Sequence, residues 1–190
     1  MITTTFYFLR HGEVENPRQI LYGRLPGFYL SLRGKKQIES LAGQLENKGI
    51  THLYSSPLER TMETADIIGA KLNLKPMISE LIIEVKLFCE GITIQDYHGN
   101  IQTDLYNKKN LARGQESIKS IAARMKHFLN FALVRHRGTK TLVVSHGDPI
   151  MILKAELQGV PFTWNYKRDN YLGTGKYYTL EVSDRNYSWI

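Results

Sequence analysis

The fold of this chain of 190 residues is indicated most strongly by the run Thr3-Thr4-Thr5-Phe6-Tyr7-Phe8-Leu9-Arg10-His11-Gly12. Its first part is rich in β-branched and aromatic residues, which is typical of a buried strand. The apolar stretch stops abruptly at two basic residues and a glycine. We therefore predict a strand over residues 3–9 with polar side chains directly after it.

Outward from this run, short apolar stretches alternate with segments of helical periodicity. Such alternation implies parallel strands joined by right-handed crossovers, in a sheet that is covered on both faces. The chain is therefore predicted to form a three-layer α/β/α sandwich with a mainly parallel central sheet. The predicted strands are 3–9, 50–55, 77–83, 139–145, 176–182 and 187–190; the predicted helices are 31–49, 57–72, 116–137 and 149–158; residues 84–111 are irregular.

The composition fits one domain over residues 1–190, because 42% hydrophobic residues can build a core without stabilising disulfides or metal ions. The single cysteine, Cys89, cannot form an internal disulfide, which favours a reducing compartment. No stretch approaches the roughly 18 apolar residues of a membrane span, and the N-terminal apolar run is too short for a signal peptide. We expect a cytoplasmic protein with no membrane partner.

The formal charge of +7 makes nucleic acid a class of ligand to consider. Basic pairs such as Lys35-Lys36 and Lys108-Lys109 are scattered among acidic residues and lack interleaved aromatic residues. They are typical of solvated faces, so no nucleic-acid partner is expected. A basic balance does suit small anionic substrates, because it raises their local concentration.

Polar side chains that could handle a phosphate group follow four of the predicted strands. In parallel sheets the carboxyl ends of the strands meet at one edge, and ligands bind there. We therefore expect these side chains to converge. They are Arg10 and His11 after the first strand, Arg60 at a helix start after the second, Glu84 after the third, and His146 with Gly147 after the fourth.

This set of residue types predicts phosphoryl transfer. A phosphate dianion needs fixed cationic donors, and the guanidinium groups of Arg10 and Arg60 match its oxygens in bidentate fashion. A neutral imidazole held in line with the phosphorus can attack it and form a phosphohistidine. His11 is the candidate nucleophile.

The remaining candidates supply hydrogen bonds and protons. His146 can bond an equatorial oxygen and, if protonated, adds positive charge where the transition state spreads negative charge; backbone N–H groups around Gly147 add to this. The leaving alkoxide needs a proton, which a carboxylic acid of raised pKa can donate before it activates water. Glu84 is the best-placed carboxylate.

Several blocks resemble the histidine phosphatase superfamily, which also contains the cofactor-dependent phosphoglycerate mutases. They are "LRHGEVEN" at 9–16, "YSSPLERTMETA" at 54–65, "GQESIKSIAARMKHFL" at 114–129 and "TLVVSHGDPI" at 141–150, with "LSLRGKKQ" near the first helix. The resemblance implies the phosphoglycerate mutase-like fold and the compact phosphatase branch.

For the site, the resemblance implies that Arg10, Arg60 and His146 bind phosphate, that His11 is phosphorylated and that a glutamate after the third strand donates the proton. It places Asn16 and Gly23 at the pocket, although Asn16 lies one residue closer to His11 than in the usual spacing. The block "SELIIEVKLFCEG" also departs from the family, with a shorter gap and no tryptophan. Glu80 and Glu90 therefore stay as alternatives to Glu84.

The loop "YGRLPG" that follows the first strand contains Arg24. A Gly- and Pro-rich loop in this position can lie over the pocket. One hypothesis is that Arg24 pairs with a second anionic group of the substrate.

The predicted activity is hydrolysis of a small phosphorylated metabolite. A mutase must shelter its phosphohistidine from water, and residues 84–111 look too short for the usual insert. The alternatives are a mutase-type phosphotransferase or an inactive phosphate-binding module. The natural substrate stays open, as does a homodimer through the apolar residues near Ile190. No metal or cofactor is expected, because His52, His98, His127 and His136 form no credible ligand set.

Overall fold

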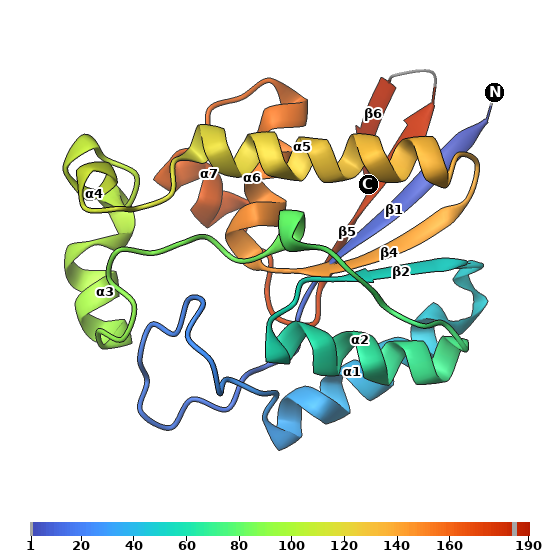
Figure 1. Ribbon diagram of the computed structural model, residues 1–190, viewed down its shortest axis with the longest axis horizontal. Helices are drawn as coiled ribbons and strands as arrows, with labels where there is room; N and C mark the ends of the chain where they lie inside the picture. Colours follow the sequence, from blue (N-terminus) through green and yellow to red (C-terminus); the bar gives the residue numbers. More distant parts are fainter. Residues whose placement is uncertain (1, 184–185) are drawn as a thin grey trace.

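The computed structural model describes residues 2–183 and 186–190 and contains a six-stranded sheet, with strand order β3-β2-β4-β1-β5-β6 (Figure 1). The first four strands in this order run parallel, whereas β5 and β6 are antiparallel to their neighbours. This confirms the predicted α/β fold with a mainly parallel sheet. The strands are β1 (Thr3–Arg10), β2 (His52–Ser55), β3 (Met77–Ile78), β4 (Lys140–Ser145), β5 (Tyr177–Ser183) and β6 (Asn186–Trp189).

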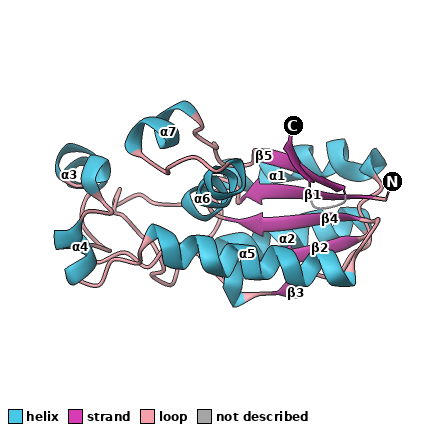
Figure 2. Cartoon of the chain, turned by 90° about the horizontal axis from the view of Figure 1, so that it is seen from above, coloured by secondary structure: helices cyan, strands magenta, loops and turns pink. Residues whose placement is uncertain are grey.

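Helices cover both faces of the sheet, and Figure 1 shows it between α5 on one side and α1 and α2 on the other. Figure 2 shows α3, α4 and α7 beyond the end toward which β1 and β4 point. The helices are α1 (Leu32–Leu45), α2 (Glu59–Leu72), α3 (Ile94–Asn100), α4 (Lys108–Ala112), α5 (Ile118–Arg135), α6 (Gly147–Gln158) and α7 (Trp164–Asp169), with 3-10 turns η1 (Glu46–Lys48), η2 (Glu80–Ile82) and η3 (Gln102–Asp104).

Strand β1 is buried on both faces and divides the core in two. Phe6 and Phe8 pack with residues of α5 and α6, while Tyr7 and Leu9 pack with residues of α1 and α2. A central parallel strand between two helical layers needs such a continuous apolar run, because neither face meets water. This is the physical reason that the opening run of the sequence is so apolar.

The start of α1 depends on two residues, Ser31 and Gly34. The Ser31 side chain accepts a hydrogen bond from the N–H of Gly34 at 2.9 Å and so caps α1. A Cβ added to Gly34 would lie 2.1 Å from the carbonyl oxygen of Glu13. Glycine is therefore needed here, since it lets α1 approach the loop that follows β1.

The prediction of a strand over 77–83 is wrong beyond Ile78. Residues 80–82 form the turn η2, whose Ile82 is buried against α5 and whose Ile82 carbonyl accepts a hydrogen bond from Ser145. The chain turns away from the sheet edge after Ile78, and this turn places the apolar side chain of Ile82 in the core under α5. Glu84 therefore follows a 3-10 turn and not a strand.

Other boundaries also differ from the predictions. Helix α2 begins at Glu59 with Leu58 as its N-cap, so Pro57 lies before the helix and not in its first turn. The segment 84–111, predicted to be irregular, contains α3 and α4, whose N-caps are Thr93 and Asn107. Both helices are short, and too few apolar positions repeat in them to give a periodic signal.

Within residues 2–183 and 186–190, none of the helices has the length and hydropathy to cross a membrane.

Candidate active site

The candidate site lies where β1 and β4 end side by side. Arg10 is the last residue of β1 and pairs in register with Ser145, the last residue of β4. His11 follows β1, and its N–H donates to the Ser145 carbonyl at 3.1 Å. His146 follows β4 as the N-cap of α6. Two neighbouring parallel strands thus bring the two histidines together, and their ring centroids lie 5.3 Å apart.

His11 is held as a neutral imidazole whose unprotonated nitrogen, Nε2, faces Arg60. Its Nδ1 lies 2.8 Å from the Gly12 carbonyl oxygen, which only accepts, so Nδ1 carries the proton and Nε2 does not. Burial, together with the charges of Arg60 and Arg10, lowers the pKa of His11 well below its ordinary value. The Nε2 atom is therefore available as a nucleophile at neutral pH.

Arg60 stands at the centre of the site and is completely buried. Its Nε donates to Nε2 of His11 at 3.2 Å, and its Nη2 lies 3.2 Å from Nδ1 of His146 and 2.8 Å from the Gly23 carbonyl oxygen. Its guanidinium carbon lies 4.8 Å from the centroid of the Tyr22 ring. Helix α2, which follows β2, thus delivers a fixed cation between the two histidines.

Arg10 supplies a second cation. Its Nη1 donates to the hydroxyl of Tyr171 at 2.9 Å and to the Leu172 carbonyl at 2.8 Å. A Cβ on Gly147 would lie 3.4 Å from the Arg10 guanidinium, an ordinary van der Waals distance, so the start of α6 lies directly beside this cation. Arg10 and Gly147 were predicted to lie together at the sheet edge, and the structure places them there.

Two guanidinium donors, Nε of Arg10 and Nη1 of Arg60, are buried without a partner in the described part of the protein, as are Oγ1 of Thr141 and Nε1 of Trp189 away from the two histidines. Buried polar groups are normally hydrogen-bonded, and guanidinium donors without partners favour an oxyanion. The two arginines, together with the N-terminus of α6, therefore form an anion site beside His11.

His146 is also buried and neutral. Nδ1 accepts from Arg60, so Nε2 carries the proton and donates to the hydroxyl of Ser56 at 2.8 Å. Burial, then the charges of Arg60, His11 and Arg10, lower the pKa of His146 well below its ordinary value. Protonated His146, considered in the sequence analysis, is disfavoured until an anion lies alongside it.

The carboxyl group of Glu84 lies beside His146 and Arg60. Its Oε2 lies 3.6 Å from Nδ1 of His146 and 4.0 Å from Nη2 of Arg60, and burial raises the pKa of its carboxyl. Glu80 is exposed on η2, and the Glu90 carboxylate accepts the N–H of Arg24 at 2.8 Å. Of the three candidate glutamates, Glu84 has the position that a proton donor needs.

Comparison with known proteins agrees with this geometry. The sequence model of the histidine phosphatase superfamily (branch 1) matches residues 6–189. The chain belongs to the histidine phosphatase superfamily.

Among its relatives, the uncharacterized protein Rv0525 of Mycobacterium tuberculosis is 37% identical over 161 residues, covering 82% of this chain and 79% of the relative. Phosphoserine phosphatase 1 of Hydrogenobacter thermophilus is 33% identical over 174 residues, covering 85% and 81%. In structure, YhfR of Bacillus stearothermophilus superposes with a TM-score of 0.83 at 23% identity, covering 97% of this chain and 94% of that one.

Asn16 and Gly23, two further residues predicted for the pocket of this histidine phosphatase, lie in the loop after β1. The side-chain amide of Asn16 makes two hydrogen bonds with the backbone of Ile20. Nδ2 donates to the Ile20 carbonyl at 2.9 Å, and Oδ1 accepts from the Ile20 N–H at 3.2 Å, so Asn16 closes the loop after β1. Gly23 has φ of 44°, and a Cβ there would lie 2.3 Å from Oε1 of Glu90. Its carbonyl meets Arg60, so Gly23 reaches the site through its backbone.

Arg24 binds elsewhere in the protein. Its Nη2 lies 3.1 Å from Oε2 of Glu116, and its Nε donates to the backbone carbonyl of Glu84 at 2.7 Å. The loop does fold against the site, but this guanidinium is engaged by protein acceptors. Two of its donors, Nε and Nη2, thus bind the segment that bears Glu84 and Glu116, and pairing of Arg24 with a second substrate anion stays a prediction.

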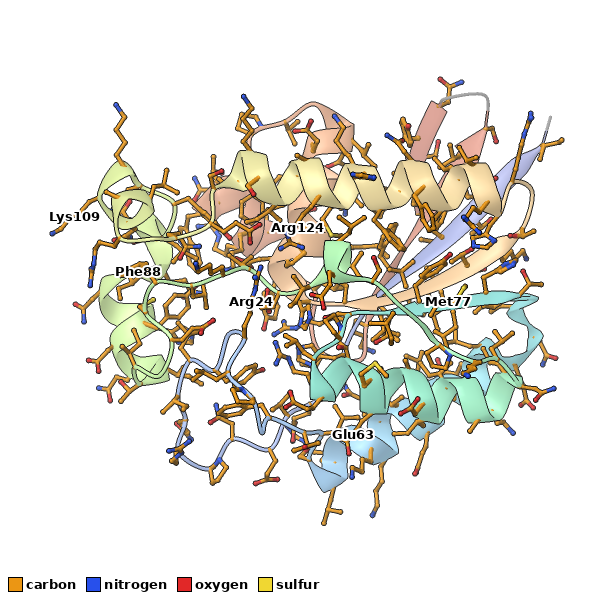
Figure 3. The ribbon with its side chains drawn as sticks, in the orientation of Figure 1. Arg24, Glu63, Met77, Phe88, Lys109 and Arg124 are labelled. Carbon is orange, nitrogen blue, oxygen red and sulfur yellow. The ribbon has the colours of Figure 1, made fainter. Side chains whose placement is uncertain are left out.

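Glu116 joins this segment to α5. Figure 3 shows Arg24 rising from the loop after β1 and Arg124 projecting from α5. Arg124 donates to Oε1 of Glu116 at 2.9 Å and to the carbonyl of Leu81 at 2.9 Å. Burial alone would raise the pKa of Glu116, but the hydrogen bond and charge of Arg124 outweigh it and lower the pKa. The network holds the chain on both sides of Glu84.

We expect Glu116→Gln to lower the free energy of unfolding by about 1–3 kcal/mol, the range for losing hydrogen bonds to charged groups. Glu156→Gln is the matched control, because Glu156 pairs with Lys126 at 2.9 Å but both side chains are nearly half exposed. That change should cost less than about 1 kcal/mol. Urea denaturation measures both. Equal losses would show that the Glu116 network does not hold the segment.

Several residues of the site were not predicted from the sequence. Ser56, which is hydrogen-bonded to His146, lies in the stretch 54–65 that resembles the superfamily. Its closeness to Arg60 in that stretch could have identified it as a site residue. Tyr22 and Tyr171 contact the two arginines from loops with no periodic pattern. No sequence feature marks them. Among the residues that the structure describes, no group of three or more His, Cys, Asp or Glu side chains could hold a metal ion.

Proposed function

We propose that this histidine phosphatase hydrolyses a small phosphomonoester through a phosphohistidine on Nε2 of His11. The observation that carries the proposal is the unprotonated Nε2 of a buried imidazole beside two unpartnered guanidinium donors, those of Arg10 and Arg60. This pairs a nucleophile with a site for the dianion that it attacks. The family membership and the phosphatase named among the relatives agree with hydrolysis.

In the first step, the lone pair of His11 Nε2 attacks phosphorus and the bond from phosphorus to the ester oxygen breaks. The carboxyl of Glu84 gives its proton to the leaving alkoxide. Arg10, Arg60 and the N-terminus of α6 stabilise the charge on the equatorial oxygens. His146, neutral before the anion binds, gains a further N–H donor when the charge of the bound phosphate favours its protonated form.

In the second step, the Glu84 carboxylate removes a proton from water, which attacks the phosphohistidine. The phosphorus–nitrogen bond breaks, inorganic phosphate leaves and the free imidazole of His11 is restored. Glu84 ends the cycle protonated, as it began. Burial of its carboxyl favours this form, because it disfavours the carboxylate.

The test is a trapping experiment with the wild-type protein. A 32P-labelled aryl phosphate is mixed with the enzyme, the reaction is quenched in base, and the labelled peptide is identified by mass spectrometry. We expect release of inorganic phosphate and a base-stable, acid-labile label on His11. Absence of both phosphate release and label would overturn the proposal. Transfer to added phosphoglycerate without phosphate release would indicate a mutase.

A cytoplasmic location and a homodimer stay predictions. The location is supported by Cys89, which is a buried free thiol and the chain's single cysteine. The expected partner is a small phosphomonoester, with no nucleic acid and no cofactor in the reaction.

A further inference from the structure

A cavity of about 300 Å³ opens beside the candidate phosphate site. Arg10 and Gly147 lie at one end of its wall, so, if the proposed function holds, a phosphate bound there would direct the organic part of the ester into the cavity. The following inference about that organic part rests on the proposed function. The remaining wall is mostly apolar or aromatic and includes Ile20, Leu21, Leu87, Ile94, Tyr97 and Met151.

The two opposite charges in this wall neutralise each other. Nζ of Lys167 lies 2.7 Å from Oδ1 and 2.9 Å from Oδ2 of Asp148, and the Tyr106 hydroxyl donates to Oδ2 at 3.0 Å. The side chains of Lys167 and Asp148 are 11% and 14% exposed. A substrate carboxylate would have to break this largely buried pair in order to bind Lys167, leaving Asp148 with an uncompensated charge.

Other cations near the cavity are also engaged. Arg24, the candidate for a second substrate anion, is held by Glu116 and by the backbone of Glu84 and does not line the cavity. Arg10 has its free Nε at the phosphate end. The other polar groups of the wall belong to His98, which is exposed, to Gln102, and to the hydroxyls of Tyr22, Tyr97 and Tyr171. Within the described residues, the cavity wall thus offers no unpaired lysine or arginine beyond the phosphate site.

The Asp148–Lys167 pair leaves no net positive charge in this part of the wall to attract a second anionic group. A carboxylate bound here would lose its water without gaining a cation in return. This loss of hydration disfavours binding.

We propose that the substrate carries an uncharged, largely apolar alkyl or aryl group on its phosphate, and that the Asp148–Lys167 pair excludes esters with a second anionic group. This sets the chain apart from the phosphoserine phosphatase and phosphoglycerate mutases among its relatives, whose named substrates carry a carboxylate. The pair determines substrate specificity, because it keeps Lys167, the lysine of the cavity wall, from binding a substrate carboxylate.

The test compares two esters that have similar size and leaving groups: 4-propylphenyl phosphate and 3-(4-phosphonooxyphenyl)propanoate. We expect kcat/KM of the wild type to favour the neutral ester by about ten-fold or more. Asp148→Asn frees Lys167 while keeping the side chain's shape, so it should raise kcat/KM for the carboxylate ester and reduce or reverse the preference. Glu156→Gln, distant from the cavity, should leave the ratio unchanged.

Equal or better turnover of the carboxylate ester by the wild type would overturn the inference, whether or not Asp148→Asn folds. An unchanged ratio in a folded Asp148→Asn protein, as judged by circular dichroism, would overturn the role of the pair. Failure of the proposed function looks different. In that case neither ester is hydrolysed above the level of His11→Ala.

Discussion

His11→Ala is expected to lower kcat for an aryl phosphate by about 10³-fold or more, because it removes the nucleophile of a covalent mechanism. Arg10 and Arg60 remain in place in this variant, and the buried donors still form an anion site. Binding of inorganic phosphate or vanadate should therefore persist while turnover and labelling disappear. Steady-state kinetics and isothermal titration calorimetry measure the two effects separately.

The control for this change is His127→Ala. His127 is exposed on α5, and its loss should leave kcat within about two-fold, as is usual for a surface substitution. If His11→Ala retained near-normal turnover, the phosphohistidine route would be wrong. Loss of anion binding together with turnover would instead indicate that the imidazole mainly supports the fold of the site, since it accepts a hydrogen bond from Arg60.

Glu84→Gln is expected to slow hydrolysis of an alkyl phosphate by about 10²–10⁴-fold, the usual contribution of general acid catalysis. An activated aryl phosphate, whose leaving group needs no proton, should lose far less in the first step. Comparing kcat/KM for the two substrates isolates this step, because kcat/KM ends with formation of the phosphoenzyme. An equal loss with both substrates would refute the acid role.

Glu80→Gln and Glu90→Gln are the matched controls, because the sequence left these two glutamates as alternatives. Glu80 is exposed, so its change should have little effect. Glu90 accepts the backbone N–H of Arg24, so its loss should affect good and poor leaving groups alike. A selective loss with poor leaving groups in either variant would move the acid role to that residue.

The pH dependence follows from the same carboxyl. Burial raises the pKa of Glu84, and the nearby charge of Arg60 opposes this shift without cancelling it. The protonated acid therefore persists to higher pH than for an ordinary glutamate. In the wild type, kcat/KM for an alkyl phosphate should fall as pH rises through this raised pKa, and the fall should be absent in Glu84→Gln.

Local hydrophobic patterns in the sequence predicted much of the fold. Strands β1 and β4 and helix α5 were predicted within about two residues, because each is a long buried element whose apolar residues follow one period. The short elements were not. Strand β3 has two residues, and both are exposed, so its extent depends on where η2 turns away from the sheet. Helices α3 and α4 were missed for the same lack of a repeated apolar pattern.

The sequence alone predicted that Arg10, His11 and His146 lie at one edge of the sheet, since each follows a predicted strand and the carboxyl ends of parallel strands share an edge. The tertiary structure was needed to show that β1 and β4 are neighbours, which glutamate lies near the histidines, what Arg24 binds and how Lys167 is neutralised. The side-chain contacts join residues 19 to 92 positions apart in the sequence. Their geometry depends on the packing of loops and helices and on competition among nearby charges, which no local pattern encodes.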